Sequence, residues 1–228
     1  MKFIAECGLN HNGNLDLTYE LIRHASWAGA DIVKFQLGWR AKGNEMNYMD
    51  SDRVESIINF CKYMEVEPLF SIFNEQAYSL IKKFDMNVLK IASRTILDEK
   101  EMVDKMIDDG RQLIISLGMW QKDEPPIKIS NQVDYLWCKS KYPCLPLDLI
   151  TLPKNFKETY FSGYSDHTIG IETPLIAISR GARLIEKHFT LDKSDTTIRD
   201  HVLSATPDEF ANLVRIGREI NKQIDIGV

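Results

Sequence analysis

The chain has 228 residues, of which 44% are hydrophobic and 27% are charged, and its formal net charge is −5. This composition is ordinary for a globular protein, and the length suffices to bury one substantial core. The negative charge argues against nucleic-acid binding by bulk electrostatics, and no apolar run approaches the roughly 20 residues of a membrane span.

The N-terminal residues and the cysteines predict a cytoplasmic location. Residues 1–6 enter a strand pattern at once, without the long apolar stretch of a signal peptide. The four cysteines, Cys7, Cys61, Cys138 and Cys144, show no CxxC spacing. We therefore expect reduced core thiols, with neither a disulfide nor a zinc site.

Short apolar runs alternate with amphipathic segments along the whole chain, which is the pattern of strands followed by helices. Strands are expected at residues 3–7, 31–36, 68–73, 88–92, 112–117, 135–139, 160–164 and 184–187. Helices are expected at 15–28, 51–64, 74–84, 98–107, 174–179 and from 207 to about 223. Ser51 is the expected N-cap of the second helix. Thr206, Pro207 and Glu209 form the start signal of the last one.

Two segments lack this regular alternation. Residues 120–132 contain Pro125-Pro126 and show no helical period, and residues 143–153 contain three prolines and allow only a short turn at 147–151. The helices that would follow the fifth and sixth strands should therefore be missing or reduced. Eight strands with polar residues at nearly every strand end favour a closed barrel over an open sheet. The prediction is a single (β/α)₈ TIM-barrel domain spanning residues 1–228.

Two lysines, Lys34 and Lys90, lie inside apolar strand patterns. Because lysines are rarely buried without a partner, the pair predicts an anion in the mouth of the barrel. The hydroxyl donors that a phosphate or carboxylate needs are the serines at neighbouring strand ends, Ser71, Ser93, Ser116 and Ser165. The alternative is that each lysine extends along the barrel rim and keeps its charge in water.

Two histidines, His167 and His188, follow neighbouring strands, with the carboxylates of Asp166 and Glu186 beside them. Two imidazoles with open positions suit Mn²⁺, Zn²⁺ or Fe²⁺, and a site completed by water and substrate oxygens favours Mn²⁺ or Mg²⁺. The alternative is that each histidine is a hydrogen-bonded residue at a strand end. The HExxH spacing of helix-borne metalloprotease sites does not occur.

Six motifs occur in the order of a known family. They are IAECGLNHNG at 4–13, AGADIVKFQ at 28–36, LKIAS at 89–93, SLGM at 116–119, GYSDHTIGIE at 163–172 and IEKHFTLD at 185–192. These motifs resemble the N-acetylneuraminate (sialic acid) synthase family from about residue 3 to residue 210. The resemblance is to the barrel domain only, without the C-terminal antifreeze-like domain that the family usually adds.

The resemblance implies a transferase of sialic acid biosynthesis. It would condense phosphoenolpyruvate with an aldose such as N-acetylmannosamine, giving a 2-keto-3-deoxy nonulosonic acid and phosphate. His167 and His188 would hold the metal, Mn²⁺ or Mg²⁺ with Zn²⁺ or Fe²⁺ as alternatives. The residues matching the phosphoenolpyruvate site are Lys34, Ser71, Lys90, Ser93, Ser116 and Ser165. The residues matching the sugar pocket are Glu6, Gln36, Tyr142, Glu186 and Asp200. Glu186, Asp200 and Lys90 are the expected catalytic groups.

One position departs from the family pattern. Thr95 lies two residues beyond Ser93, where the family usually carries an acid/base carboxylate, and a threonine is no base near pH 7. Glu186, Asp200 and Glu6 are the candidates to replace that carboxylate. Two alternatives therefore stay open: a related carbon–carbon-forming reaction on a different aldehyde, and a non-catalytic barrel. Family members dimerise, and a homo-oligomer is left open.

Overall fold

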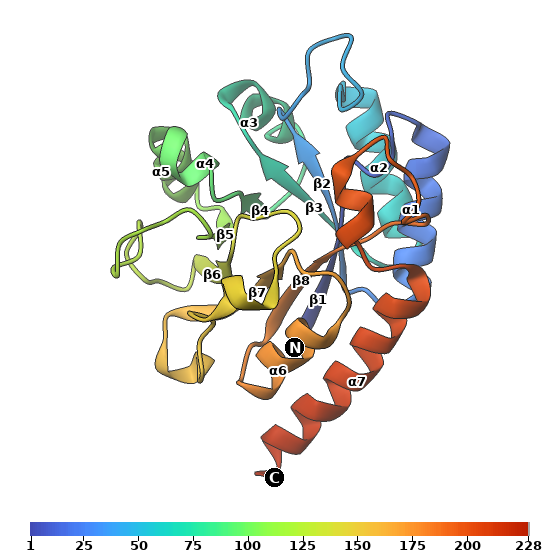
Figure 1. Ribbon diagram of the computed structural model, residues 1–228. Coiled ribbons are helices and arrows are strands. Elements are labelled where there is room, and N and C mark those ends of the chain that lie inside the picture. The colour runs from blue at the N-terminus through green and yellow to red at the C-terminus, as the bar shows by residue number, and fades with distance from the viewer. Residues whose placement is uncertain (228) are drawn as a thin grey trace.

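Eight parallel strands hydrogen-bond to one another in chain order and close into a barrel (Figure 1). The computed structural model describes residues 1–227. The strands are β1 (Lys2–Gly8), β2 (Ile32–Leu37), β3 (Glu67–Ile72), β4 (Val88–Ile91), β5 (Gln112–Ser116), β6 (Val133–Cys138), β7 (Phe161–Asp166) and β8 (Leu184–His188). Each overlaps an expected strand, with ends that differ by at most two residues. The predicted (β/α)₈ barrel is confirmed.

Helices surround the barrel except on one side. They are α1 (Leu15–Trp27), α2 (Ser51–Tyr63), α3 (Glu75–Ile81), α4 (Thr95–Asp98), α5 (Lys100–Asp108), α6 (Glu172–Ser179) and α7 (Pro207–Asp225). Residues 117–132, all described, contain no helix, and only the 3₁₀ turns η1 (Pro146–Leu149) and η2 (Phe156–Glu158) lie between β6 and β7. The predicted loss of the helices that would follow the fifth and sixth strands is confirmed. In Figure 1 these segments form the loops beside β5 and β6.

Helix ends show where local signals held and where they failed. Thr206 and Glu209 exchange side-chain and backbone hydrogen bonds as a capping box, and Pro207 is the first residue of α7. The expected cap Ser51 is wrong. Asp50 caps α2, because its carboxylate accepts a hydrogen bond from the Arg53 amide at 2.9 Å. The expected helix at 98–107 begins at Lys100, after the separate turn of α4.

The barrel interior has two layers that follow from strand geometry. The first layer is apolar and consists of Ile4, Ile32, Leu69, Ile114, Leu136 and Leu184. Side chains two residues apart on a strand point to the same face. Two residues further along the same strands, toward their carboxyl ends, stand Glu6, Lys34, Ser71, Ser116, Cys138 and Glu186. The polar layer therefore lies on an apolar base at the carboxyl end of the barrel.

The contact between β7 and β8 needs a glycine. A Cβ atom on Gly163 would lie 1.8 Å from the carbonyl oxygen of Leu184, which is far inside van der Waals contact. Because Gly163 pairs with Leu184, Ser165 is brought opposite Glu186 two residues further on. This register places two polar side chains of adjacent strands together in the second layer.

Two further expectations concern the chain as a whole. The four cysteines are buried and unpaired, as predicted. Within residues 1–227, no helix combines the length and the apolar character required to cross a bilayer.

Candidate active site

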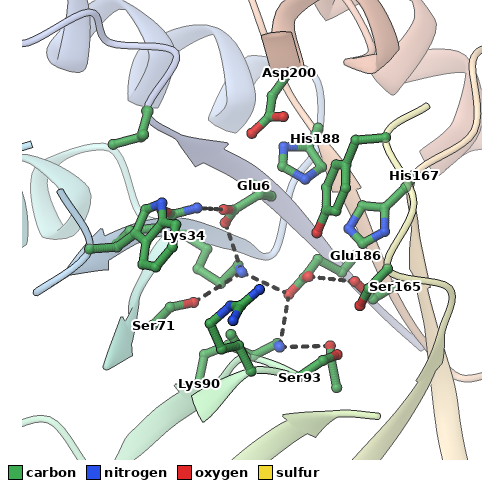
Figure 2. A pocket seen from close by; sticks show the side chains of 18 of the residues that line it. Glu6, Lys34, Ser71, Lys90, Ser93, Ser165, His167, Glu186, His188 and Asp200 are labelled. Carbon is green, nitrogen blue, oxygen red and sulfur yellow. Dashed lines mark hydrogen bonds and ion pairs between the residues drawn. The ribbon is translucent and has the colours of Figure 1, made fainter. Parts of the chain in front are cut away.

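A cavity of about 570 Å³ opens at the carboxyl ends of the strands, where TIM-barrel enzymes place their active sites. Every residue to which the sequence assigned a catalytic, substrate-binding or metal-binding role lines this cavity. They are Glu6, Lys34, Gln36, Ser71, Lys90, Ser93, Ser116, Tyr142, Ser165, His167, Glu186, His188 and Asp200. Figure 2 shows the labelled members pointing toward one another from different strands and from the segments that follow them.

The polar layer of the barrel forms the floor of the cavity, and Lys34 is part of it. Its Nζ is 2.9 Å from Glu6 Oε2 and 3.2 Å from Glu186 Oε2. It also donates a hydrogen bond to Ser71 Oγ at 3.1 Å. Burial acts to lower the pKa of Lys34, but the two carboxylates outweigh it and raise the pKa above its ordinary value. The chain itself thus supplies part of the negative charge that a buried lysine requires.

Lys90 is less well compensated than Lys34. Its Nζ donates to Ser116 Oγ at 2.7 Å and to the Ile91 carbonyl at 3.1 Å, while Glu186 Oε2 is 3.9 Å away. Burial lowers the pKa of Lys90 to about 8, assisted by the nearby charge of Lys34 and opposed by Glu186. An anionic ligand at this position would stabilise the charged form.

The pKa values of the two floor carboxyl groups are shifted in opposite directions. Burial acts to raise the pKa of Glu186, but Lys34 and Lys90 lower it to about 2, and Ser165 Oγ donates to it at 2.7 Å. Burial raises the pKa of Glu6, with Lys34 opposing and Glu186 assisting. A pair of carboxyl groups with pKa values shifted in opposite directions is typical of acid/base sites.

Three of the predicted serines keep a proton to donate. Ser71 accepts from Lys34, Ser116 accepts from Lys90, and Ser93 Oγ accepts from the Gly118 amide at 2.8 Å. Each hydroxyl therefore has its own O–H free for a ligand oxygen. Ser165 differs, because its O–H already donates a hydrogen bond to Glu186.

His167 and His188 lie on one wall of the cavity, with ring centroids 5.4 Å apart. His167 Nδ1 is 2.8 Å from the Lys139 carbonyl oxygen. A carbonyl only accepts hydrogen bonds, so Nδ1 carries the proton and Nε2 has a free lone pair. His188 Nδ1 is buried without a hydrogen-bond partner among the described residues. Burial lowers the pKa of His188, against the opposing charge of Asp200.

This imidazole pair fits a divalent cation. Metal-bound histidines commonly donate their other N–H to a carbonyl, as His167 does. Among residues 1–227, no group of three His, Cys, Asp or Glu side chains could hold an ion by itself. A metal here would therefore complete its coordination with water and substrate oxygens.

Asp166 does not take part in this wall, contrary to the expectation that its carboxylate lies beside the histidines. Asp166 does not line the cavity. Its Oδ2 pairs with Lys187 Nζ at 2.6 Å, and its Oδ1 accepts from Tyr164 and Thr168. Its hydrogen-bonding capacity is used within the protein.

Thr95 also faces the protein and not the cavity. It is the first residue of α4, is 2% exposed, and its Oγ1 has no partner among the described residues. The preceding residue, Arg94, lines the cavity instead. In this chain, the position where the family resemblance places an acid/base group is therefore not in contact with the site.

Sequence reasoning missed several residues that line the cavity, namely Trp39, Arg40, Phe73, Met119, Cys138 and Arg199, and assigned no role to Arg94. Apart from Cys138, the last residue of β6, they lie outside the strands, where no regular burial pattern could identify them. A usable signal was adjacency, since Arg94 directly follows Ser93 and Arg199 directly precedes Asp200.

The chain is similar to known proteins over most of its length. The model of the NeuB family matches residues 40–228. An uncharacterised protein of Methanocaldococcus jannaschii is 32% identical, over 98% of this chain and 72% of its own length. The N,N'-diacetyllegionaminic acid synthase of Legionella pneumophila is 31% identical, over 98% of this chain and 73% of its own.

A solved structure is similar over almost the whole chain. It is the N-acetylneuraminic acid (sialic acid) synthetase of Leptospira borgpetersenii serovar Hardjo-bovis, with a TM-score of 0.84 and 28% identity. The match covers 99% of this chain and 85% of that one. On these matches, the chain belongs to the NeuB family of sugar-acid synthases.

Proposed function

We propose that the protein is a metal-dependent synthase of the cytoplasm that condenses phosphoenolpyruvate with an aldose similar to N-acetylmannosamine. The products would be a 2-keto-3-deoxy nonulosonic acid and inorganic phosphate. One observation carries the proposal: a buried floor with two lysines and three free serine hydroxyls adjoins a pair of imidazoles in one cavity.

Phosphoenolpyruvate is assigned to the floor. Lys90 is the floor cation with least compensation from the chain, and the hydroxyls of Ser93 and Ser116 stand beside it. These groups would bind phosphate and carboxylate oxygens by charge-assisted hydrogen bonds. Ser71 would add a further donor, and Lys34 a second cation.

The imidazole wall is assigned to the aldehyde. A divalent cation held by His167 and His188, Mn²⁺ or Mg²⁺ with Zn²⁺ or Fe²⁺ as alternatives, would polarise the aldehyde oxygen when bound. Tyr142, whose ring centroid is 4.1 Å from that of His167, would limit the orientation of the sugar against this wall. Gln36, which donates to Glu6 at 3.0 Å, would hold that carboxyl toward the sugar.

The carboxylates divide the proton transfers. Glu6, whose pKa burial raises, would give a proton to the aldehyde oxygen as C3 of phosphoenolpyruvate bonds to the aldehyde carbon. Glu186, ionised because its pKa is about 2, would stabilise the positive charge that develops at C2. That low pKa makes Glu186 a weak base, so Asp200 would take the proton of the water that adds to C2. Lys90 would neutralise the phosphate that leaves as its bond to C2 breaks.

Consumption of phosphoenolpyruvate tests this proposal. The protein with Mn²⁺ and a panel of aldoses should consume phosphoenolpyruvate only when an aldose is present, with formation of a 2-keto-3-deoxy acid. EDTA should stop the reaction and added Mn²⁺ should restore it. The absence of turnover with every aldose, N-acetylated or not, would refute the proposed function.

A further inference from the structure

Three arginines stand at the rim of the cavity on different loops. Arg40 follows β2, Arg94 follows β4, and Arg199 begins η3 (Arg199–Leu203) after β8. Their charges are only weakly compensated by carboxylates. Arg94 is 4.0 Å from Asp98 across an exposed helix turn, and Arg199 Nε is 3.3 Å from its neighbour Asp200. Arg40 has no ion pair within the described part of the chain.

The floor below them holds equal numbers of basic and acidic side chains. Two cations, Lys34 and Lys90, face two carboxyl groups, Glu6 and Glu186, within 4.0 Å. At the rim, the three arginines share the cavity lining with the single carboxylate of Asp200. The excess of basic over acidic side chains in the cavity lining therefore lies at its outer edge and not at the floor.

The rim arginines have a structured setting. Arg40 has a φ of +48°, in the left-handed region that costs a side-chain-bearing residue about 1 kcal/mol or more. The guanidinium of Arg199 lies 4.5 Å from the ring centroid of Tyr142, and the Tyr142 ring packs against His167 at an interplanar angle of 38°. Arg199 is thereby held over the imidazole wall, although its side chain is 72% exposed.

The rim also provides an apolar surface. Trp39 directly precedes Arg40, lines the cavity, and has its ring centroid 5.4 Å from that of Phe73. A cavity of about 570 Å³ is in the range that accepts a molecule larger than phosphoenolpyruvate alone. An extended aldose thus has space to reach from the imidazole wall to the rim.

We propose, building on the proposed function, that the aldose substrate is anionic, and that Arg40, Arg94 and Arg199 bind a phosphate or carboxylate at the end remote from its aldehyde. The aldehyde carbon must meet C3 of phosphoenolpyruvate at the floor, so the other end of the sugar points outward. Planar guanidinium groups bind phosphate and carboxylate oxygens in pairs, which favours arginine for this task.

Equilibrium binding tests the proposal without turnover. Isothermal titration of the Mn²⁺-loaded protein would compare N-acetylmannosamine, its 6-phosphate and its uronic acid, with no phosphoenolpyruvate present. Both anionic sugars should bind about tenfold tighter or more than the neutral one, and their order identifies the preferred anion. Equal affinity for the three sugars would overturn the proposal.

Arginine variants locate the effect. R94Q and R199Q should each reduce the preference for the anionic sugar by about tenfold, and R94K should retain part of it because charge remains while paired hydrogen bonding is lost. The matched control is R215Q, an exposed arginine of α7 whose side chain donates a hydrogen bond to Asn212 and does not line the cavity. A loss of preference in R215Q, or none in the rim variants, would contradict the assignment.

A second titration separates this subsite from the floor. Phosphoenolpyruvate should bind R94Q and R199Q with an affinity within about twofold of the unmodified protein, because its anionic groups are assigned to Lys90 and the serines. If the variants weaken phosphoenolpyruvate as much as the anionic sugar, the arginines serve phosphoenolpyruvate and the proposal fails. If no sugar supports phosphoenolpyruvate consumption, the proposed function fails, while the binding preference is still judged by the titrations.

Discussion

Lys187 Nζ lies 2.6 Å from Asp166 Oδ2, and both side chains are completely buried. Each residue immediately precedes one of the two histidines of the cavity wall, since His167 follows Asp166 and His188 follows Lys187. Lys187 also donates to the carbonyl of Thr168. The ion pair therefore joins the two segments that carry the imidazoles, on the side of the strands away from the cavity.

Loss of this ion pair should destabilise the fold strongly. Asp166→Asn leaves the charge of Lys187 buried without a compensating anion, which costs about 3–5 kcal/mol. Urea unfolding followed by circular dichroism measures the change. Asp104→Asn is the matched control, since Lys100 and Asp104 form an exposed pair at 2.7 Å that should contribute about 0.3–0.5 kcal/mol. A similar cost for both variants would contradict the buried-pair argument.

The pKa of Lys90 predicts how activity depends on pH. As pH rises through about 8, Lys90 loses its proton and with it the charge assigned to phosphoenolpyruvate. The value of kcat/KM for phosphoenolpyruvate, which reports the free enzyme, should fall by up to about tenfold per pH unit above pH 8. Lys90→Gln should lower kcat/KM and abolish its fall above pH 8. An unchanged fall in that variant would assign the pH dependence to another group.

Loss of the Lys90 proton should raise the stability of the fold, although it lowers activity. The pKa of Lys90 is below its ordinary value of 10.5, so folding opposes protonation of this side chain. Its unfavourable contribution is complete below about pH 8 and is relieved as pH rises toward 10.5. The free energy of unfolding, measured in urea between pH 8 and 10, should therefore rise more for the unmodified protein than for Lys90→Gln.

Replacement of Glu186 should separate catalysis from binding. Glu186→Gln removes the carboxylate assigned to charge at C2, so kcat should fall by about 10²–10³. The KM for phosphoenolpyruvate should not rise, because Lys34 and Lys90 lose a competing anion. Steady-state kinetics provide both values, with Glu219→Gln on the exposed face of α7 as control. A raised KM with an unchanged kcat would show that Glu186 acts in binding and not in the reaction.

Metal binding should depend on both imidazoles. Titration of Mn²⁺ followed by electron paramagnetic resonance should show a bound ion in the unmodified protein, and its affinity should fall about 100-fold or more in His167→Gln and in His188→Gln. His24→Gln on α1 is the control, because His24 is partly exposed and does not line the cavity. Equal Mn²⁺ affinity in all four proteins would reject the assigned ligands.

Thr95 should be replaceable by an apolar residue. Thr95→Val removes a buried hydroxyl without a partner and keeps the side-chain shape, so stability should rise by about 1 kcal/mol with activity unchanged. Thr95→Glu should destabilise the protein, because the new carboxylate would be buried away from the cavity. Thermal and urea unfolding measure both effects. A stable and more active Thr95→Glu variant would place this residue back in the site.

Much of the fold and of the predicted site was readable in the sequence, because both leave local patterns in it. Short apolar runs between amphipathic segments identify the strands, and the polar residue two positions after an apolar one, as in Ile4 and Glu6 or Ile32 and Lys34, marks the carboxyl end of the barrel. The prolines at 125 and 126 predicted the missing helix in the same local way. These signals need no knowledge of which strands are neighbours.

Tertiary structure alone decided which groups meet. Closure of the barrel sets β1 beside β8, so Lys34 pairs with both Glu6 and Glu186, which are 180 residues apart in the chain. The same packing directs Asp166 to Lys187, buries Thr95 and sets the three arginines around one opening. Periodicity gives the face of a strand on which a side chain lies, but partners and pKa values depend on distances between distant segments, and those exist only once the barrel has closed.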